Sequence, residues 1–257
     1  MILNDPLEKQ VANVSNKQKK IVLLLVEGES EQILLYDRLR RKFHQHDIRF
    51  RVERGDLFGN LRHQKRDIKA AVTELVKQFL HRYRLKESDL HAVVHITDTD
   101  GCFIDDDAVQ IDNHSGQGRR TFYTEKNILV VDEMQRKSIV KRNELKSMNT
   151  RIMVATSYVM RSHIPYQLYF FSRTLEHVLF DKPNPRSENK LHKVEQFVDR
   201  LNEPLEEFLE QFLKLRDRAN MSQIYEESWH YVMQGNHSLQ RVTNVSLMFD
   251  FIEGVQE

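Results

Sequence analysis

Two short, unbroken apolar runs stand out in the hydrophobic pattern of the chain. Residues 21–26 read IVLLLV, and residues 92–96 read AVVHI. Apolar residues on both faces are typical of a strand in a parallel sheet that helices cover on each side. Each run ends abruptly in acids and a glycine, because EGESE follows the first and TDTDG the second. The pattern therefore predicts two buried strands with carboxylates at their carboxyl ends.

The segments around these runs predict helices that alternate with strands. Residues 30–43 and 62–85 have apolar positions at helical spacing, and Ser30 is the predicted N-cap of the first helix. Residues 46–52 are a candidate strand between them. The order strand, helix, strand, helix, strand predicts an α/β fold with a mainly parallel sheet flanked by helices.

The second half of the chain has a different pattern. Residues 102–125 are rich in Asp, Gly and Asn and predict a long loop. A charged helix is expected over 132–147 and a further strand over 151–158. From about Pro165 the pattern predicts helices only, the first of them over 166–180. The predicted organisation is an arm over 1–19, an α/β domain over 20–160 and a helical C-terminal region over 161–257.

The composition of the chain excludes several classes of protein. The formal net charge is +1, from 39 Lys and Arg against 38 Asp and Glu, so contact with nucleic acid would depend on local basic patches. The single cysteine, Cys102, excludes an internal disulfide framework and a Cys-rich zinc site. No apolar run approaches the roughly 20 residues of a membrane span, and the first residues carry no secretory signal. We therefore expect a cytoplasmic protein that does not associate with membranes.

The acids after the two apolar runs are candidate ligands of a divalent metal ion. In a strand, Asp98 and Asp100 would share a face, because side chains repeat every second residue. The carboxyl ends of parallel strands meet at one crevice, where Glu27 could join them, with Glu31 in the first turn of the next helix. Carboxylate oxygens are the ligands that Mg²⁺ and Mn²⁺ prefer. The alternative is that these acids are helix caps and solvated loop residues, but the repetition of the pattern favours a metal site.

The same residues carry a resemblance to a known family. Residues 26–31, VEGESE, and 97–101, TDTDG, resemble the two signatures of the Toprim domain, which occurs in topoisomerases, bacterial primases and OLD nucleases. The resemblance covers roughly residues 20–160. It implies Mg²⁺- or Mn²⁺-dependent phosphodiester chemistry, with Glu27 as general acid/base and Asp98 and Asp100 as metal ligands. OLD-type nucleases also pair the first glutamate with an acid four residues on, which matches Glu31.

A second resemblance involves residues 169–180, which read YFFSRTLEHVLF. Small Toprim-like proteins of phage defence, the RloB-like and abortive-infection groups, are similar in size. They often carry a Ser and a Leu/Ile-Glu pair that opens a later helix near the site. This implies that Glu176, with Ser172, completes a second metal site. The alternative is that Glu176 lies on an amphipathic helix whose Leu and Val residues form a packing stripe.

These observations lead to one expected function and two alternatives. We expect a metal-dependent nuclease that acts on RNA, with tRNA among the candidates, or on DNA, as an effector of phage defence. Arg119 and Arg120, which follow the acidic loop, and Arg62 are candidate contacts to substrate phosphates. The alternatives are a primase-like nucleotidyltransferase and a catalytically inactive Toprim-fold sensor or binding subunit. The chain has no Walker A pattern, so the expected protein partner is a separate ATPase or a second copy of the chain.

Overall fold

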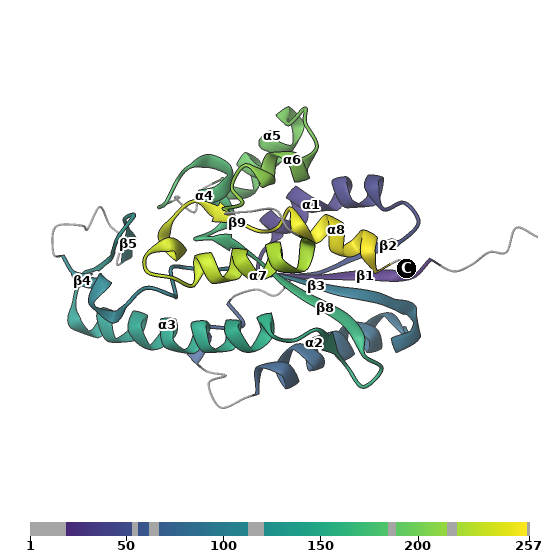
Figure 1. The fold of residues 1–257 in the computed structure, drawn as a ribbon, viewed down its shortest axis with the longest axis horizontal. Helices are drawn as coiled ribbons and strands as arrows, with labels where there is room; N and C mark the ends of the chain where they lie inside the picture. The colour runs from purple at the N-terminus through teal and green to yellow at the C-terminus, as the bar shows by residue number, and fades with distance from the viewer. Residues whose placement is uncertain are drawn as a thin grey trace, which may run out of the picture.

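A central sheet with helices on both faces organises the molecule (Figure 1). The computed structural model describes residues 19–52, 56–61, 67–112, 121–184, 189–214 and 220–255. In these residues the sheet is mixed and mostly parallel, so the predicted α/β class is confirmed. A small second sheet lies beyond the carboxyl ends of the central strands, at the left of Figure 1.

The described strands form these two sheets. The central sheet contains β1 (Ile21–Val26), β2 (Asp47–Val52), β3 (Leu90–Asp98), β7 (Tyr158–Val159), β8 (Ile164–Ser172) and β9 (Val242–Thr243). Its order is β2-β1-β3-β8-β7, with β9 also paired to β8. Strands β2, β1, β3 and β8 are parallel, whereas β7 and β9 run antiparallel to β8. The small sheet has the order β4-β6-β5 and contains β4 (Val109–Ile111), β5 (Thr121–Tyr123) and β6 (Ile128–Val130).

Helices cover both faces of the central sheet (Figure 1). The α-helices are α1 (Glu29–Lys42), α2 (Ile68–Tyr83), α3 (Glu133–Val154), α4 (Leu175–Phe180), α5 (Lys190–Arg200), α6 (Leu205–Glu210), α7 (Met221–Val232) and α8 (Leu247–Gly254). Short 3₁₀ turns are η3 (Glu87–Asp89), η4 (Asp106–Ala108) and η5 (His237–Leu239). None of the helices within the described ranges is both long and apolar enough to cross a membrane.

Strand β1 divides its side chains between two hydrophobic cores. All six of its residues are buried. Val22, Leu24 and Val26 pack into the core beneath α1, α5 and α8, whereas the alternate residues pack into the core beneath α2 and α7. Each fully buried Leu or Val contributes about 1.5–3 kcal/mol relative to an exposed position. Burial on both faces explains why the run has no polar alternation.

The prediction of helices only after Pro165 is wrong. Residues 164–172 form β8, which pairs with β3 in parallel register from Val93 opposite Tyr166 to Asp98 opposite Phe171. The run is apolar at almost every position, so its pattern does not distinguish a buried strand from a buried helix. Helix α4 begins only after Thr174, whose side chain accepts a hydrogen bond from the His177 amide. Residues 161–257 therefore contribute strands β8 and β9 as well as helices.

Three further predictions are corrected. The expected strand over 151–158 is wrong, because α3 continues to Val154 and only Tyr158 and Val159 form a strand. Ser30 is not the N-cap of α1, because Gly28 occupies that position and Ser30 lies buried in the first turn. The expected loop over 102–125 includes η4, β4 and β5 in its described part.

Candidate functional site

Two of the predicted acids meet at the carboxyl ends of β1 and β3. Glu27 directly follows β1, and Asp98 is the last residue of β3. Glu27 Oε1 accepts hydrogen bonds from the Asp98 amide (3.2 Å) and from Thr97 Oγ1 (2.5 Å). The parallel pairing of β1 with β3 therefore brings both acids to one edge of the sheet, as the sequence predicts.

Asp100 reaches the site from a turn and not from the strand. Strand β3 ends at Asp98, and Asp100 has a left-handed backbone (φ 49°), so the prediction that the two aspartates share a strand face is wrong. The Asp100 amide donates to the Arg173 carbonyl (3.0 Å), and Arg142 Nη2 donates to the Asp100 carbonyl (3.0 Å). These bonds fix the turn beside the acids.

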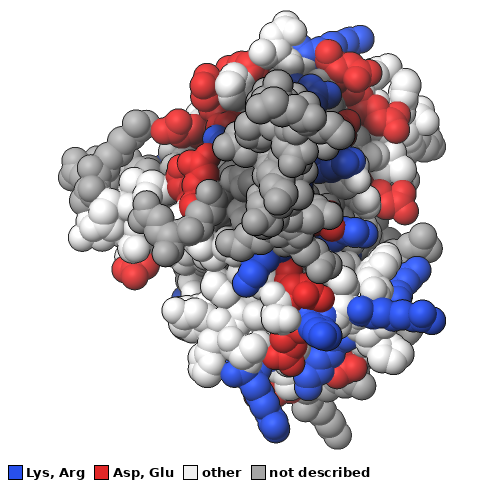
Figure 2. All heavy atoms as spheres, turned by 90° about the vertical axis from the view of Figure 1, so that its right-hand side faces the viewer, with Lys and Arg blue, Asp and Glu red and all other residues white. Residues whose placement is uncertain are grey.

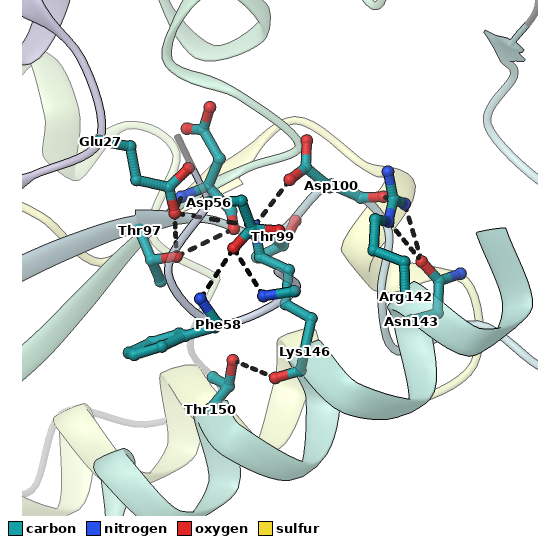
Figure 3. Close-up of polar contacts among 12 residues, drawn as sticks. Glu27, Asp56, Phe58, Thr97, Thr99, Asp100, Arg142, Asn143, Lys146 and Thr150 are labelled. Carbon is teal, nitrogen blue, oxygen red and sulfur yellow. Dashed lines mark hydrogen bonds and ion pairs between the residues drawn. The ribbon is translucent and has the colours of Figure 1, made fainter. Parts of the chain in front are cut away.

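A buried lysine that the sequence analysis did not single out lies at the centre of the site (Figure 3). Lys146 comes from α3, and its side chain is 0% exposed. Its Nζ lies 2.6 Å from Asp100 Oδ2, 3.2 Å from Asp56 Oδ2 and 3.7 Å from Glu27 Oε1. In the sequence Lys146 is one of many charges on a polar helix, so only its position against the sheet distinguishes it.

Asp56 is a second residue of the site that the sequence did not indicate. Its Oδ1 accepts hydrogen bonds from the amides of Phe58 (3.0 Å) and Gly59 (2.8 Å), which leaves Oδ2 for Lys146. Asn149 Nδ2 on α3 donates to the Phe58 carbonyl (2.8 Å) and ties this short segment to the helix. Three carboxylates from separate segments therefore surround one ammonium group.

A second group of acids adjoins Asp98. Asp98 Oδ1 accepts a hydrogen bond from the Leu175 amide at the start of α4 (3.2 Å), and Glu176 follows directly. Glu31 on α1 is buried, and its Oε2 has no hydrogen-bond partner. Glu176 is also buried and lies 3.2 Å from Lys190 Nζ. Asp98, Glu31 and Glu176 are thus brought together from β3, α1 and α4.

Burial and neighbouring charges shift the pKa values of these acids. Burial is the main cause that raises the pKa of Glu27 to about 8 and that of Glu31 to about 7. Burial and then the charges of Glu27, Glu31, Asp100 and Glu176 raise the pKa of Asp98 well above its usual range. Asp100 differs, because Lys146 and Arg142 outweigh the effect of burial and lower its pKa. Asp100 is therefore an ionised partner of Lys146, whereas burial outweighs the nearby positive charge at Glu27 and Glu31.

The remaining predicted residues have separate outcomes. Ser172 is fully buried, and its Oγ donates to the Ser238 carbonyl (2.9 Å), so its hydroxyl ties β8 to η5. Glu29, at the start of α1, is exposed. Arg62, Arg119 and Arg120 lie outside the described residues, as does the predicted arm up to residue 18.

The fit of a divalent ion depends on donor chemistry and on charge. Within the part of the chain that the structure describes, no three His, Cys, Asp or Glu side chains are arranged to hold a metal ion. The donor set nevertheless suits Mg²⁺ or Mn²⁺, which take oxygen ligands. The unpartnered Glu31 Oε2 and the raised pKa of Asp98 are features that a bound cation would satisfy. The residues therefore fit such an ion in their chemistry, but their side chains are not arranged as a closed ligand shell.

Positive and negative side chains are mixed on the face at the amino ends of the central strands. Figure 2 shows this face, where Lys and Arg side chains lie among Asp and Glu side chains.

Comparison of the chain with protein-family models, with curated proteins and with solved structures finds no match. The function is therefore argued from the site at the carboxyl ends of the strands.

Proposed function

We propose that the chain is a Toprim-like nuclease that uses Mg²⁺ or Mn²⁺ to hydrolyse phosphodiester bonds in RNA or DNA. The convergence of Glu27, Asp98 and Glu176 from the ends of β1 and β3 and the start of α4 carries this proposal, and burial raises the pKa values of Glu27 and Asp98. The Toprim resemblance of residues 26–31 and 97–101 supports it. A role in phage defence, with a separate ATPase or a second copy as partner, stays a prediction.

The acids would divide into two roles. Asp98, Glu31 and Glu176 would hold the cation, since Lys146 does not pair with them. When bound, the cation would polarise the phosphoryl group and lower the pKa of an attacking water molecule. Glu27 has a pKa of about 8, which suits a group that takes up and releases a proton near neutral pH. Lys146 would keep Asp100 ionised beside the reacting group without a second cation, because it lowers the pKa of that carboxyl.

One observation favours the inactive sensor or binding subunit as a second candidate. Lys146 already neutralises the Glu27, Asp56 and Asp100 group, as the ion of a metalloenzyme would. A degenerate site that replaced its metal ion with a lysine would have this arrangement. The two candidates differ in whether any divalent ion binds to the remaining acids.

Cleavage assays with matched variants test the proposal. Purified protein would be incubated with Mg²⁺ or Mn²⁺ and labelled tRNA, single-stranded DNA or plasmid. We expect Glu27→Gln and Asp98→Asn to lower the cleavage rate by roughly 10²–10⁴-fold. Glu29→Gln changes an exposed acid in the same motif and should cleave like the wild type. Circular dichroism would verify that each variant is folded.

Two outcomes would contradict the nuclease proposal. Cleavage that persists in both site variants would show that it arises elsewhere or from a contaminant. No cleavage by the wild type, together with no binding of Mg²⁺ or Mn²⁺ in calorimetry, would favour the inactive subunit. Incorporation of nucleotides on a template would instead indicate the primase-like alternative.

A further inference from the structure

Arg173 is a buried cation that lacks a counter-charge. It follows β8 directly and is 2% exposed. Its Nε and Nη1 atoms are buried without a hydrogen-bond partner, and no ion pair with an acid is found for it in the described ranges. Charged side chains are almost never fully buried unless they are paired. Burial accordingly lowers the pKa of Arg173 to about 10.

Neighbouring side chains hold the Arg173 guanidinium in place. Its carbon Cζ lies 5.1 Å from the centre of the Tyr123 ring, and its Nη2 lies 3.4 Å from His177 Nε2. His177 Nδ1 lies 3.1 Å from the Ser172 carbonyl and accepts a hydrogen bond from the Arg173 amide at 3.2 Å, so the ring is held against the backbone beside Arg173. Burial is the first cause that lowers the pKa of His177 to about 4, which keeps the ring neutral. The guanidinium is thus oriented while two of its donor atoms stay unused.

The unused donors adjoin the candidate site. The Arg173 carbonyl accepts a hydrogen bond from the Asp100 amide, which holds the backbone of Arg173 beside the turn that carries Asp100. Tyr123 also accepts a hydrogen bond from Arg142 Nη1 (3.4 Å), and Arg142 in turn binds the Asp100 carbonyl. Burial lowers the pKa of Arg173 although the nearby charge of Asp100 acts to raise it, and Asp100 Oδ2 is paired with Lys146 at 2.6 Å. Two arginines therefore border the acids on one side.

We propose that Arg173 binds an anionic phosphate group of the ligand through its unused Nη1 donor, beside the carboxylate site. Nε and Nη1 lie on different edges of the guanidinium, so the contact with one phosphate group would be a charge-assisted hydrogen bond from Nη1 and not a paired contact from both atoms. Tyr123 lies over the guanidinium but is only partly buried, on a strand that pairs with β6 alone, so the ligand would enter by displacing this ring. The identification of the phosphate with that of a nucleic acid rests on the proposed function.

Arg241 provides a matched control. It also lies over an aromatic ring, with Cζ 4.3 Å from the centre of Phe212. Its Nε and Nη2 donate to the Val178 carbonyl at 2.9 and 2.7 Å, so its hydrogen bonds are made within the protein. A binding arginine and a structural arginine should therefore respond oppositely to removal of the guanidinium. Arg173→Met should keep or raise the melting temperature, whereas Arg241→Met should lower it.

The test measures binding without divalent cations, so that it does not depend on cleavage. Inorganic phosphate would be titrated into the wild type, Arg173→Met, Arg173→Lys and Arg241→Met, with sodium chloride at equal ionic strength as the reference. We expect Arg173→Met to weaken phosphate binding by about tenfold or more, since a charge-assisted hydrogen bond is lost. Arg173→Lys should lie between it and the wild type, and Arg241→Met should bind like the wild type. A single-stranded oligonucleotide titrated in parallel would show whether the phosphate source is a nucleic acid or free phosphate.

The outcomes separate this inference from the nuclease proposal. Phosphate binding that depends on Arg173 in a protein that cleaves nothing would support the inference and contradict the nuclease. A wild type that does not bind phosphate, or an Arg173→Met variant that binds it equally well, would overturn the inference even if cleavage is observed. A large loss of stability in Arg173→Met with unchanged binding would identify Arg173 as structural.

Discussion

Replacement of Lys146 by methionine tests whether one buried ammonium group holds the site together. Methionine keeps most of the aliphatic length of the side chain and removes the charge. The ammonium lies within 3.7 Å of Glu27, Asp56 and Asp100 and is fully buried. Its removal leaves Asp100 and Asp56 without their nearest cation, while Arg142 stays close to Asp100 only through the backbone carbonyl.

The expected cost follows from these distances. At an effective dielectric constant near 20, each contact corresponds to about 4–6 kcal/mol of Coulomb attraction. Most of that attraction is offset in the wild type by the desolvation of the charges, and Glu27, with a pKa of about 8, is largely protonated at neutral pH. Removal of one partner from a buried ion pair costs about 3–5 kcal/mol, so we expect the free energy of unfolding to fall by that amount at pH 8. Since domains are stable by only about 5–15 kcal/mol, the variant would be close to unfolding.

The loss of unfolding free energy in Lys146→Met should depend on pH. In the wild type, Lys146 and Arg142 lower the pKa of Asp100 despite its burial, so this group stabilises the fold above its unfolded pKa and loses that effect in acid. In the variant, burial is opposed only by the weaker effects of Arg142 and Lys190, so the pKa of Asp100 would rise and folding would take up a proton. The stability of the variant should therefore fall as pH rises from about 4 to 8. The difference from the wild type should be smaller at pH 5 than at pH 8.

Urea denaturation followed by circular dichroism at pH 5 and pH 8 measures these differences. Lys42→Met is the matched control, because Lys42 also contacts two acids, Glu206 at 2.8 Å and Glu253 at 3.4 Å, but its side chain is 34% exposed. Its loss should cost at most about 1 kcal/mol. The reasoning would be refuted if Lys146→Met were as stable as Lys42→Met at pH 8, or if the loss were the same at both pH values.

Three other expectations concern the acids and the core. Asp98→Asn should raise the free energy of unfolding at pH 8 without divalent cations by roughly 1–2 kcal/mol, because it removes an acid whose pKa is raised by burial and by the neighbouring carboxylates; urea denaturation that shows a loss would contradict this. Mg²⁺ affinity, measured by calorimetry, should rise between about pH 6 and pH 8 by up to about tenfold per unit for each proton released, since Glu31, with a pKa of about 7, and Asp98, with a raised pKa, must lose protons to bind the ion. Affinity independent of pH would exclude them as ligands. Trp229→Ala should lower the free energy of unfolding by about 3–5 kcal/mol, because Trp229 is 2% exposed and packs on Phe170 with ring centres 4.7 Å apart. A smaller loss in urea denaturation would mean that neighbouring side chains fill the space left by the ring.

Part of the site was predictable because its residues are tied to strand ends. Glu27 and Asp98 follow apolar runs whose burial on both faces is visible in the sequence, and parallel neighbours bring their carboxyl ends together. The position of Asp100 was only partly predictable, because the strand ends two residues earlier and the carboxylate reaches the site through a left-handed turn. Whether these acids act as metal ligands stays a prediction.

The sequence by itself determined the local elements at the start of the chain. The stripe of apolar residues in α2 and its Asp67 N-cap fix a helix whatever it packs against, and the run of β1 requires burial on both faces. Such signals are local, because they depend only on side chains within a few residues of one another.

Only the tertiary structure decided the fourth parallel strand and the charge balance of the site. The apolar run of β8 is compatible with helix or strand, and its pairing with β3 and β9 selects the strand by satisfying its backbone hydrogen bonds. Lys146, Asp56 and Arg173 read as ordinary surface charges in the sequence, and each is distinguished only by residues far away in the chain. The acids at the end of β1 and β3 could be predicted from the sequence. The cations beside them, Lys146 and Arg173, are placed only by the packing of α3 and β8, because electrostatic partners are set by distance in space and not by separation along the chain.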